Sequence, residues 1–250
     1  MSRRSFDRIV GNLDLTGRLS LYDALPNPWN PLLMFGRVAP IELEIGSGKG
    51  LFLRKAAQAN PAHDFLGIEV AYRYALISAA QLAKNGVKNS LMVNADAAKL
   101  LAERVPTESL AAVHVYFPDP WWKKSHRKRR ILRADVVKMI ENRLLPGGTL
   151  YFRTDVEEYY RSTLELVAAE TTLQGPVETE NGALALPEAL PVERGMDNPP
   201  ARKSAPQTDP DTLDFSTHFE RRTRLNHLPV YGCYWTKSLP KSLSKPTDSA

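Results

Sequence analysis

A chain of 250 residues, 43% of them hydrophobic, is long enough to bury one sizeable core, and it contains no apolar run long enough to cross a membrane. The single cysteine, Cys233, can build neither a disulfide framework nor a zinc site by itself, so no metal is expected. The net charge of +5 is concentrated in one stretch without acids, which favours a polyanionic partner such as nucleic acid. That stretch consists of Lys123, Lys124, Arg127, Lys128, Arg129, Arg130 and Arg133.

The first part of the chain, residues 1–38, is predicted to be an irregular arm. Residues 1–7 are basic but lack the apolar stretch of a secretory signal, so we expect a cytoplasmic protein. Residues 39–238 are predicted to form the main domain, and 239–250 a disordered tail. The arm is compatible with a monomer or a homodimer.

Strands and helices alternate along the main domain. Strands are predicted at 41–45, 65–70, 91–93, 110–117, 149–153 and 230–235, and helices at 51–59, 72–84, 131–144 and 157–170. This alternation predicts a doubly wound α/β fold with a mostly parallel sheet and right-handed crossovers. The proline-rich stretch 174–214 has little periodicity and is predicted to be a long insertion loop.

A glycine-rich turn follows the first of these strands, at the edge where such sheets bind ligands. Gly46, Gly48 and Gly50 are spaced as Gly-x-Gly-x-Gly, with Glu44 just before them. The dinucleotide fingerprint has a different spacing, Gly-x-Gly-x-x-Gly, and receives a pyrophosphate. The acid favours a positively charged ligand that carries an amino group. A glycine-rich turn without any ligand is the alternative.

Acidic and amide side chains end the next two strands. Glu69 stands where nucleotide-binding folds place an acid that accepts from ribose hydroxyls. Asn94 and Asp96 follow the third strand at the same edge. Asp96 is interpreted either as an acceptor for an adenine amino group or as the N-cap of a helix that begins at Ala97.

The fourth strand runs directly into an acid, two tryptophans and the basic stretch. Pro118 and Pro120 stiffen the backbone around Asp119. Trp121 and Trp122 offer flat faces on which a base can stack, worth roughly 1–3 kcal/mol per base. The cations that follow suit phosphates. This combination predicts an RNA-binding catalytic edge, within which His126 is interpreted as an ordinary surface histidine.

Four segments together resemble the bacterial tRNA (guanine-N7)-methyltransferases. They are Glu44–Gly50, Phe117–Trp121, Thr154–Asp155 and Thr217–Arg221. The resemblance implies a Rossmann-like class I S-adenosylmethionine-dependent methyltransferase fold. It also implies methyl transfer from S-adenosylmethionine to N7 of the variable-loop guanine at position 46 of tRNA.

The resemblance also assigns roles to single residues. S-adenosylmethionine is expected to bind at the glycine turn and the acids around it, namely Glu44, Gly46, Gly48, Gly50, Glu69, Asn94, Asp96 and Asp119. Asp119 is expected to be the catalytic acid as well. The tRNA is expected to contact Lys123, Asp155, Thr217, His218, Phe219 and Glu220.

Alternatives remain open at this point. Asp155 together with Glu158 is equally typical of a capping box at the start of the helix near Glu157. A methyltransferase of another RNA is the nearest rival function. A non-catalytic RNA-binding module is a second rival, although it would not retain the acids Glu44, Glu69 and Asp119 at one edge.

Overall fold

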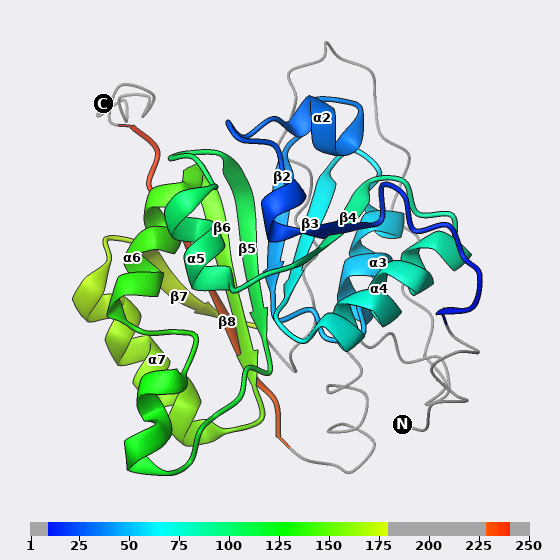
Figure 1. Ribbon diagram of the computed structural model, residues 1–250. Helices are drawn as coiled ribbons and strands as arrows, with labels where there is room; N and C mark the ends of the chain where they lie inside the picture. Colours follow the sequence, from blue (N-terminus) through cyan, green and yellow to red (C-terminus); the bar gives the residue numbers. More distant parts are fainter. Residues whose placement is uncertain (1–9, 180–228, 241–250) are drawn as a thin grey trace, which may run out of the picture.

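The computed structural model describes residues 10–179 and 229–240. Within these residues, strands form one sheet in the order β1-β4-β3-β2-β5-β6-β8-β7, with helices on both faces (Figure 1). In chain order the strands are β1 (Leu19–Leu21), β2 (Ile41–Ile45), β3 (Asp64–Glu69), β4 (Ser90–Asn94), β5 (Leu110–Tyr116), β6 (Leu144–Thr154), β7 (Gln174–Glu178) and β8 (Tyr231–Thr236). This architecture confirms the predicted doubly wound α/β fold.

The strand order reverses at β2, in the middle of the sheet. Its neighbours are β3 on one side and β5 on the other, and all pairings among β1 to β6 are parallel. Only β8 differs, running antiparallel to both β6 and β7. In sheets of this kind, ligands bind outside the carboxyl ends of the strands at the point of reversal. The glycine turn that follows β2 therefore lies at the expected binding edge.

Helices divide the interior into two layers, one on each face of the sheet. They are α2 (Pro31–Phe35), α3 (Leu51–Ala59), α4 (Tyr72–Lys84), α5 (Ala97–Glu103), α6 (Ala134–Arg143) and α7 (Glu157–Glu170), with short 3-10 helices η1 (Tyr22–Ala24) and η2 (Lys124–Arg129). Helices α3 and α4 pack on one face, and α5, α6 and α7 pack on the other (Figure 1).

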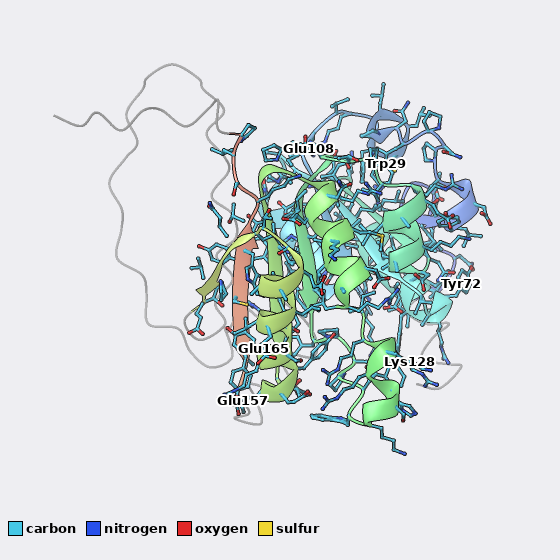
Figure 2. The ribbon with its side chains drawn as sticks, turned by 90° about the vertical axis from the view of Figure 1, so that its left-hand side faces the viewer. Trp29, Tyr72, Glu108, Lys128, Glu157 and Glu165 are labelled. Atoms are coloured by element: carbon cyan, nitrogen blue, oxygen red, sulfur yellow. The ribbon has the colours of Figure 1, made fainter. Side chains whose placement is uncertain are left out.

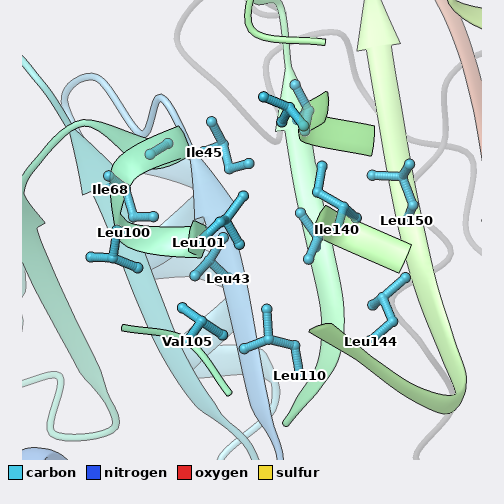
Figure 3. Packing of buried hydrophobic residues seen from close by; sticks show 14 of the residues in the cluster. Leu43, Ile45, Ile68, Leu100, Leu101, Val105, Leu110, Ile140, Leu144 and Leu150 are labelled. Atoms are coloured by element: carbon cyan, nitrogen blue, oxygen red, sulfur yellow. The ribbon is translucent and has the colours of Figure 1, made fainter. Parts of the chain in front are cut away.

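The face under α5, α6 and α7 is purely apolar near β2. Figure 3 shows Leu43 and Ile45 of β2 and Ile68 of β3 directed toward Leu100 and Leu101 of α5. All five side chains are buried. Each such aliphatic side chain contributes roughly 1.5–3 kcal/mol relative to an exposed one. This layer therefore holds the central strands rigid beneath the binding edge.

The opposite face of β2 carries two acidic side chains into the interior. Apolar and acidic residues alternate along Ile41–Ile45, a pattern typical of a strand with one solvent-exposed face. The strand is nevertheless buried on both faces, because α3 covers the face that carries the acids. Glu42 is only 2% exposed and Glu44 only 3%. A buried carboxylate needs hydrogen-bond partners or a ligand, since its desolvation is otherwise unfavourable.

The predicted arm contributes an edge strand to the sheet. Leu19 to Leu21 form β1, which pairs in parallel with β4, Leu19 lying opposite Met92. Three residues are too few to show a strand period in sequence, so β1 was not expected. Helix α2 follows, and the side chain of Asn30 caps it by accepting from the backbone N–H of Leu33 at 3.2 Å.

Two strands differ from the sequence prediction. Strand β7 (Gln174–Glu178) falls at the start of the predicted loop, where Gly175 and Pro176 predict irregular chain. It is an edge strand, the place in a sheet where proline is tolerated. Strand β6 begins at Leu144, before the predicted start at 149, and includes the Pro146–Gly148 segment. The rest of the predicted loop and the tail beyond residue 240 lie outside the described residues.

Within the described parts of the chain, no helix has both the length and the apolar character needed to span a bilayer.

Candidate functional site

A cavity of about 740 Å³ opens at the carboxyl ends of β2 to β5. Its size is that of an ordinary small-molecule site. The predicted residues that line it are Glu44, Gly46, Gly48, Glu69, Asp96 and Asp119. Four separate stretches of sequence thus meet at the edge that the strand order indicates.

The glycines of the turn between β2 and α3 have two different roles: two of them line the cavity, and the third allows close helix packing. Gly46 and Gly48 line the cavity with positive φ angles of 77° and 54°, a region that side chains disfavour. Gly50 does not line the cavity. A Cβ atom placed on it would lie 1.9 Å from Oγ of Ser78, so Gly50 instead allows α3 to pack closely against α4. Gly46 and Gly48 thus lie in the cavity wall and Gly50 outside it, and ligand contact by Gly50 stays a prediction.

Glu44 presents to the cavity a carboxyl group with one unpaired oxygen. Its Oε2 atom is buried and has no hydrogen-bond partner. Burial raises the pKa of the Glu44 carboxyl to about 8, and the nearby charge of Glu69 adds to the shift. A buried carboxyl with one unpaired oxygen is expected to favour a cationic ligand, because a positive charge would offset the desolvation of its ionised form.

Glu69 closes the glycine turn from β3. Its Oε2 accepts from the backbone N–H of Gly48 at 2.9 Å, and its Oε1 accepts from that of Ala71 at 2.8 Å. Each oxygen keeps a further lone pair, so both can still accept from ligand hydroxyls. Glu69 therefore shapes the site and remains available to it.

Asn94 and Asp96 at the end of β4 have different tasks. The side-chain amide of Asn94 donates to the carbonyl oxygens of Glu69 (2.8 Å) and Val70 (3.0 Å), and it does not line the cavity. Asp96 lines the cavity and also caps α5, where its Oδ1 accepts from the backbone N–H of Lys99 at 2.9 Å. The N-cap interpretation of Asp96 is thus confirmed. The second carboxylate oxygen of Asp96, Oδ2, does not take part in the cap.

A short loop after β5 holds Asp119 between two strained residues. Phe117 and Trp121 have positive φ angles of 49° and 46°, unusual for residues with side chains. The backbone N–H of Phe117 donates to the carbonyl of Arg153 at 2.8 Å, which anchors the loop to β6. Such conformations cost about 1–3 kcal/mol each and persist only when the surroundings hold them.

Asp119 and Trp121 lie on the boundary between two cavities. Both line the large cavity, and both line a second one of about 400 Å³ together with Trp122, Lys123 and His126. The Asp119 loop therefore separates a small-molecule pocket from an open depression beside the basic stretch. Two reactants, one in each cavity, would therefore both contact this loop.

Two residues that the sequence analysis did not connect with Trp121 lie against its ring. The ring of His126 meets it edge-on with centroids 5.8 Å apart, and the guanidinium of Arg129 lies 5.1 Å from its ring centroid. The description of His126 as an ordinary surface histidine is therefore incomplete. Their spacing of five and eight residues from Trp121 becomes meaningful only because η2 turns the chain back over the indole.

The basic stretch projects from the binding edge. Figure 2 shows Lys128 on η2 at the same end of the molecule as Glu157 and opposite Glu108, which precedes β5. Lys123 is exposed, and Trp122 beside it is 68% exposed. Exposed cations around an exposed aromatic ring form a surface that suits a single-stranded nucleic acid.

Besides Lys123, the residues predicted to contact tRNA are Asp155 and the segment from Thr217 to Glu220. Asp155 is half-buried at the start of α7 and lines neither cavity. The predicted capping box is absent, because the α7 N-cap is Val156 and Glu158 forms ion pairs with Arg127 and Arg130 instead. Thr217, His218, Phe219 and Glu220 lie outside the described residues.

A buried polar cluster lies beneath the large cavity, on the α3 face of the sheet. Glu42 bonds Nδ1 of His63 at 2.6 Å and Nε2 of His114 at 2.7 Å, and His114 Nδ1 bonds the Tyr116 hydroxyl at 2.9 Å. Burial opposes ionisation of Glu42, but the hydrogen bonds from the two histidines outweigh it and lower its pKa to about 2. The Tyr116 ring lines the cavity, so the cluster fixes part of the pocket wall.

Comparisons with known proteins identify proteins that are similar to this chain in sequence. A family model described as putative methyltransferase matches residues 38–188. A tRNA (guanine-N(7)-)-methyltransferase of Rhodopirellula baltica is 40% identical over 232 residues, which covers 90% of this chain and 77% of that protein. The protein of the same name from Aromatoleum aromaticum is 39% identical and covers 77% of this chain and 76% of its own length.

Solved structures with the same fold are more distant in sequence. The crystal structure of the 16S rRNA methyltransferase KamB has a TM-score of 0.52 at 17% identity, and the match covers 82% of this chain and 90% of that one. At this identity the likeness establishes a common fold. It agrees with the Rossmann-like class I methyltransferase fold that the sequence predicts.

Proposed function

Because this chain belongs to the family of the tRNA (guanine-N(7)-)-methyltransferases, we propose that it transfers a methyl group from S-adenosylmethionine to N7 of a guanine in tRNA. Membership confirms the resemblance that the sequence motifs indicate. The observation that carries the proposal is the position of Asp119, which lines both a small-molecule cavity and a neighbouring cationic, aromatic depression.

The large cavity fits S-adenosylmethionine. The buried, unpaired Oε2 of Glu44 suits a ligand that is cationic and carries an amino group. Gly46 and Gly48 leave open space above the turn, while Glu69 and the free oxygen of Asp96 supply acceptors for ribose hydroxyls and the adenine amino group. Asn94 and Gly50 support this pocket from outside it. When bound, S-adenosylmethionine supplies an electrophilic methyl group on a positively charged sulfur.

The chemistry at guanine requires little proton transfer. N7 of neutral guanine has a free lone pair, so the chain does not need a strong general base. What the protein must supply is placement, which can lower a barrier by roughly 7–11 kcal/mol, and tolerance of the new positive charge on the ring. We assign the second task to the Asp119 carboxylate, whose position between two prolines keeps it preorganised.

Asp119 is also suited to select the base. A carboxylate accepts from two neighbouring donors at once, as the N1–H and the amino group of guanine present them. Trp121, with Arg129 and His126 against its ring, offers a stacking face beside that acid. Adenine lacks the N1–H donor, so the same arrangement disfavours it.

The tRNA surface is assigned to the exposed side of the loop. Lys123 and the cations of η2 suit phosphates on both sides of an extruded base. The resemblance points to the variable-loop guanine at position 46 as the target, with Asp155 and the segment from Thr217 to Glu220 as further contacts. A tRNA substrate is consistent with work in the cytoplasm.

A tRNA transcript that carries 7-deazaguanosine at position 46 tests the proposed target. This base keeps the Watson–Crick edge but replaces N7 by a carbon without a lone pair. We expect labelled methyl transfer to the guanosine transcript and none to the 7-deaza transcript. Equal transfer to both would show that another atom or another guanine accepts the methyl group. Melting curves of the two transcripts control for altered tRNA folding.

A further inference from the structure

Arg130 differs from the exposed arginines of the basic stretch because its side chain is buried, with 8% exposed. Its Nε donates to the Pro120 carbonyl at 2.8 Å, Nη1 to Oγ of Ser162 at 3.2 Å and Nη2 to Oε2 of Glu158 at 2.6 Å. The guanidinium also lies 4.4 Å from the ring centroid of Tyr159. Protein groups therefore occupy the guanidinium on its edges and on one face.

The bond to Pro120 falls at a strained point of the Asp119 loop. The Pro120 carbonyl belongs to the peptide that leads into Trp121, whose φ angle is 46°. Holding that carbonyl fixes the plane of the peptide and so favours the unusual backbone of Trp121. The other end of the loop is tied to β6 through Phe117 and Arg153. Asp119 thus sits between two anchors, and Arg130 supplies the second.

The contacts of Arg130 connect the loop to a rigid element. Glu158, Tyr159 and Ser162 all belong to the first two turns of α7, which packs on β6 and β8. The Arg130 hydrogen bond lowers the pKa of the Glu158 carboxyl, so this partner stays ionised at neutral pH. Arg127 shares the same carboxylate at 3.1 Å, but it is 48% exposed.

We infer that Arg130 is a positioning residue: it fastens the Asp119–Trp121 loop to α7, and it makes no contact with RNA phosphate. This inference rests on the proposed function, because the loop it holds carries the catalytic acid and the stacking face. It divides the basic stretch into an internal support and an external nucleic-acid surface. Charge alone does not distinguish the two.

Lysine cannot replace arginine in this arrangement. The planar guanidinium directs separate N–H groups at Pro120, Ser162 and Glu158, whereas an ammonium donates from a single atom. Arg130→Lys therefore keeps the charge and loses the geometry. Lys128→Ala is the contrasting variant, because Lys128 is exposed on the same short helix.

Steady-state kinetics on tRNA separate the two roles. We expect Arg130→Lys to lower kcat by about 10- to 100-fold, since a misplacement of about 1 Å can cost 100-fold, and to leave KM for tRNA within about 3-fold. Lys128→Ala is expected to raise KM for tRNA. Unchanged kcat in Arg130→Lys, or a raised KM with normal kcat, would overturn the inference in favour of a phosphate contact.

Hydrogen–deuterium exchange gives a readout that does not need activity. The peptide covering 117–123 should exchange faster in Arg130→Lys than in the wild type, whereas β5 and β6 should not change, and Lys128→Ala should match the wild type. Unaltered exchange in Arg130→Lys would overturn the inference. If wild-type protein fails to methylate tRNA, the proposed function fails, and the exchange result still decides the role of Arg130.

A second variant keeps the test decisive if Arg130→Lys does not fold. Glu158→Gln removes the ion pair and leaves the Arg130 bond to Pro120. It is expected to change kcat and exchange of the loop in the same direction by a smaller factor. Wild-type values for both quantities would contradict the inference.

Discussion

Two carboxyl groups on one strand show how neighbouring side chains determine whether a buried acid is protonated. Glu42 and Glu44 lie on the same buried face of β2, yet the pKa of the first falls to about 2 and that of the second rises to about 8. Burial raises the pKa in both cases. At Glu42 the hydrogen bonds from His63 and His114 reverse the effect, and Glu44 has no such partner for Oε2. A cationic ligand would supply the positively charged partner that Glu44 lacks.

The raised pKa of Glu44 predicts a specific dependence of stability on pH. In the unfolded chain this carboxyl titrates near its ordinary value of 4.5, and in the folded protein it titrates near 8. Its contribution to stability is therefore complete below about pH 4.5 and is lost as the pH rises to about 8. Within that window the free energy of unfolding should fall by up to about 1.4 kcal/mol per pH unit through this group.

Glu44→Gln isolates this contribution. Urea unfolding without cofactor should show the variant gaining stability relative to the wild type as the pH rises through the window. S-adenosylhomocysteine should bind more weakly to the variant. A stability difference that does not change with pH would show that Glu44 is not held protonated in the folded protein.

At the scale of elements, the binding edge depends on how closely α3 and α4 pack. The glycine turn lets α3 begin against α4, with Gly50 at the contact. Gly46 in the same turn also has a positive φ angle, but it faces open space. Two glycines with the same backbone requirement thus differ in their side-chain environment, and this difference gives a matched pair of variants.

Gly50→Ala should destabilise the protein more than Gly46→Ala. Both variants carry the backbone cost of a positive φ angle, about 1–2 kcal/mol. Only Gly50→Ala also places a Cβ atom 1.9 Å from Oγ and 2.8 Å from Cβ of Ser78, and overpacking of this kind costs about 1–3 kcal/mol more. Urea denaturation compares the two free energies of unfolding. Equal losses would show that α4 yields without cost.

The sequence predicts the central elements well because each carries a local signal. Strand β2, the glycine turn and α3 follow one another with the expected periods, and Asp96 stands where an N-cap is required. Strand β1 was missed because three residues show no period, and β7 because Gly175 and Pro176 predict a loop. Local patterns fail where pairing with a distant strand decides the structure.

The candidate site shows the same limit at the level of side chains. Glu42, His63 and His114 come from three separate strands or turns, so no spacing in the sequence reveals their cluster. The capping box, one of the two alternatives for Asp155, is not formed, and Glu158 instead pairs with Arg130 across the fold. A basic stretch can be recognised in a sequence, but which of its cations is internal depends on tertiary contacts.

At the scale of the whole molecule, the fold brings a ligand pocket and a cationic surface to the same loop. The pocket belongs to the β2–β5 edge, and the surface belongs to η2, which projects beyond it (Figure 2). Asp119 is the charged residue that lines both cavities. Methyl transfer to RNA requires that the methyl donor and the base meet, and the residues shared by the two cavities lie where they would do so.

The most direct test is methyl transfer from labelled S-adenosylmethionine to bulk tRNA, followed by nucleoside analysis, with wild-type protein and Asp119→Asn side by side. We expect label in 7-methylguanosine with the wild type and about 100-fold slower transfer with the variant, as for the loss of one preorganised electrostatic group. S-adenosylhomocysteine binding to both proteins controls for an intact pocket. Label in a different nucleoside, or near-normal turnover by Asp119→Asn, would contradict the assigned reaction or the role of its acid.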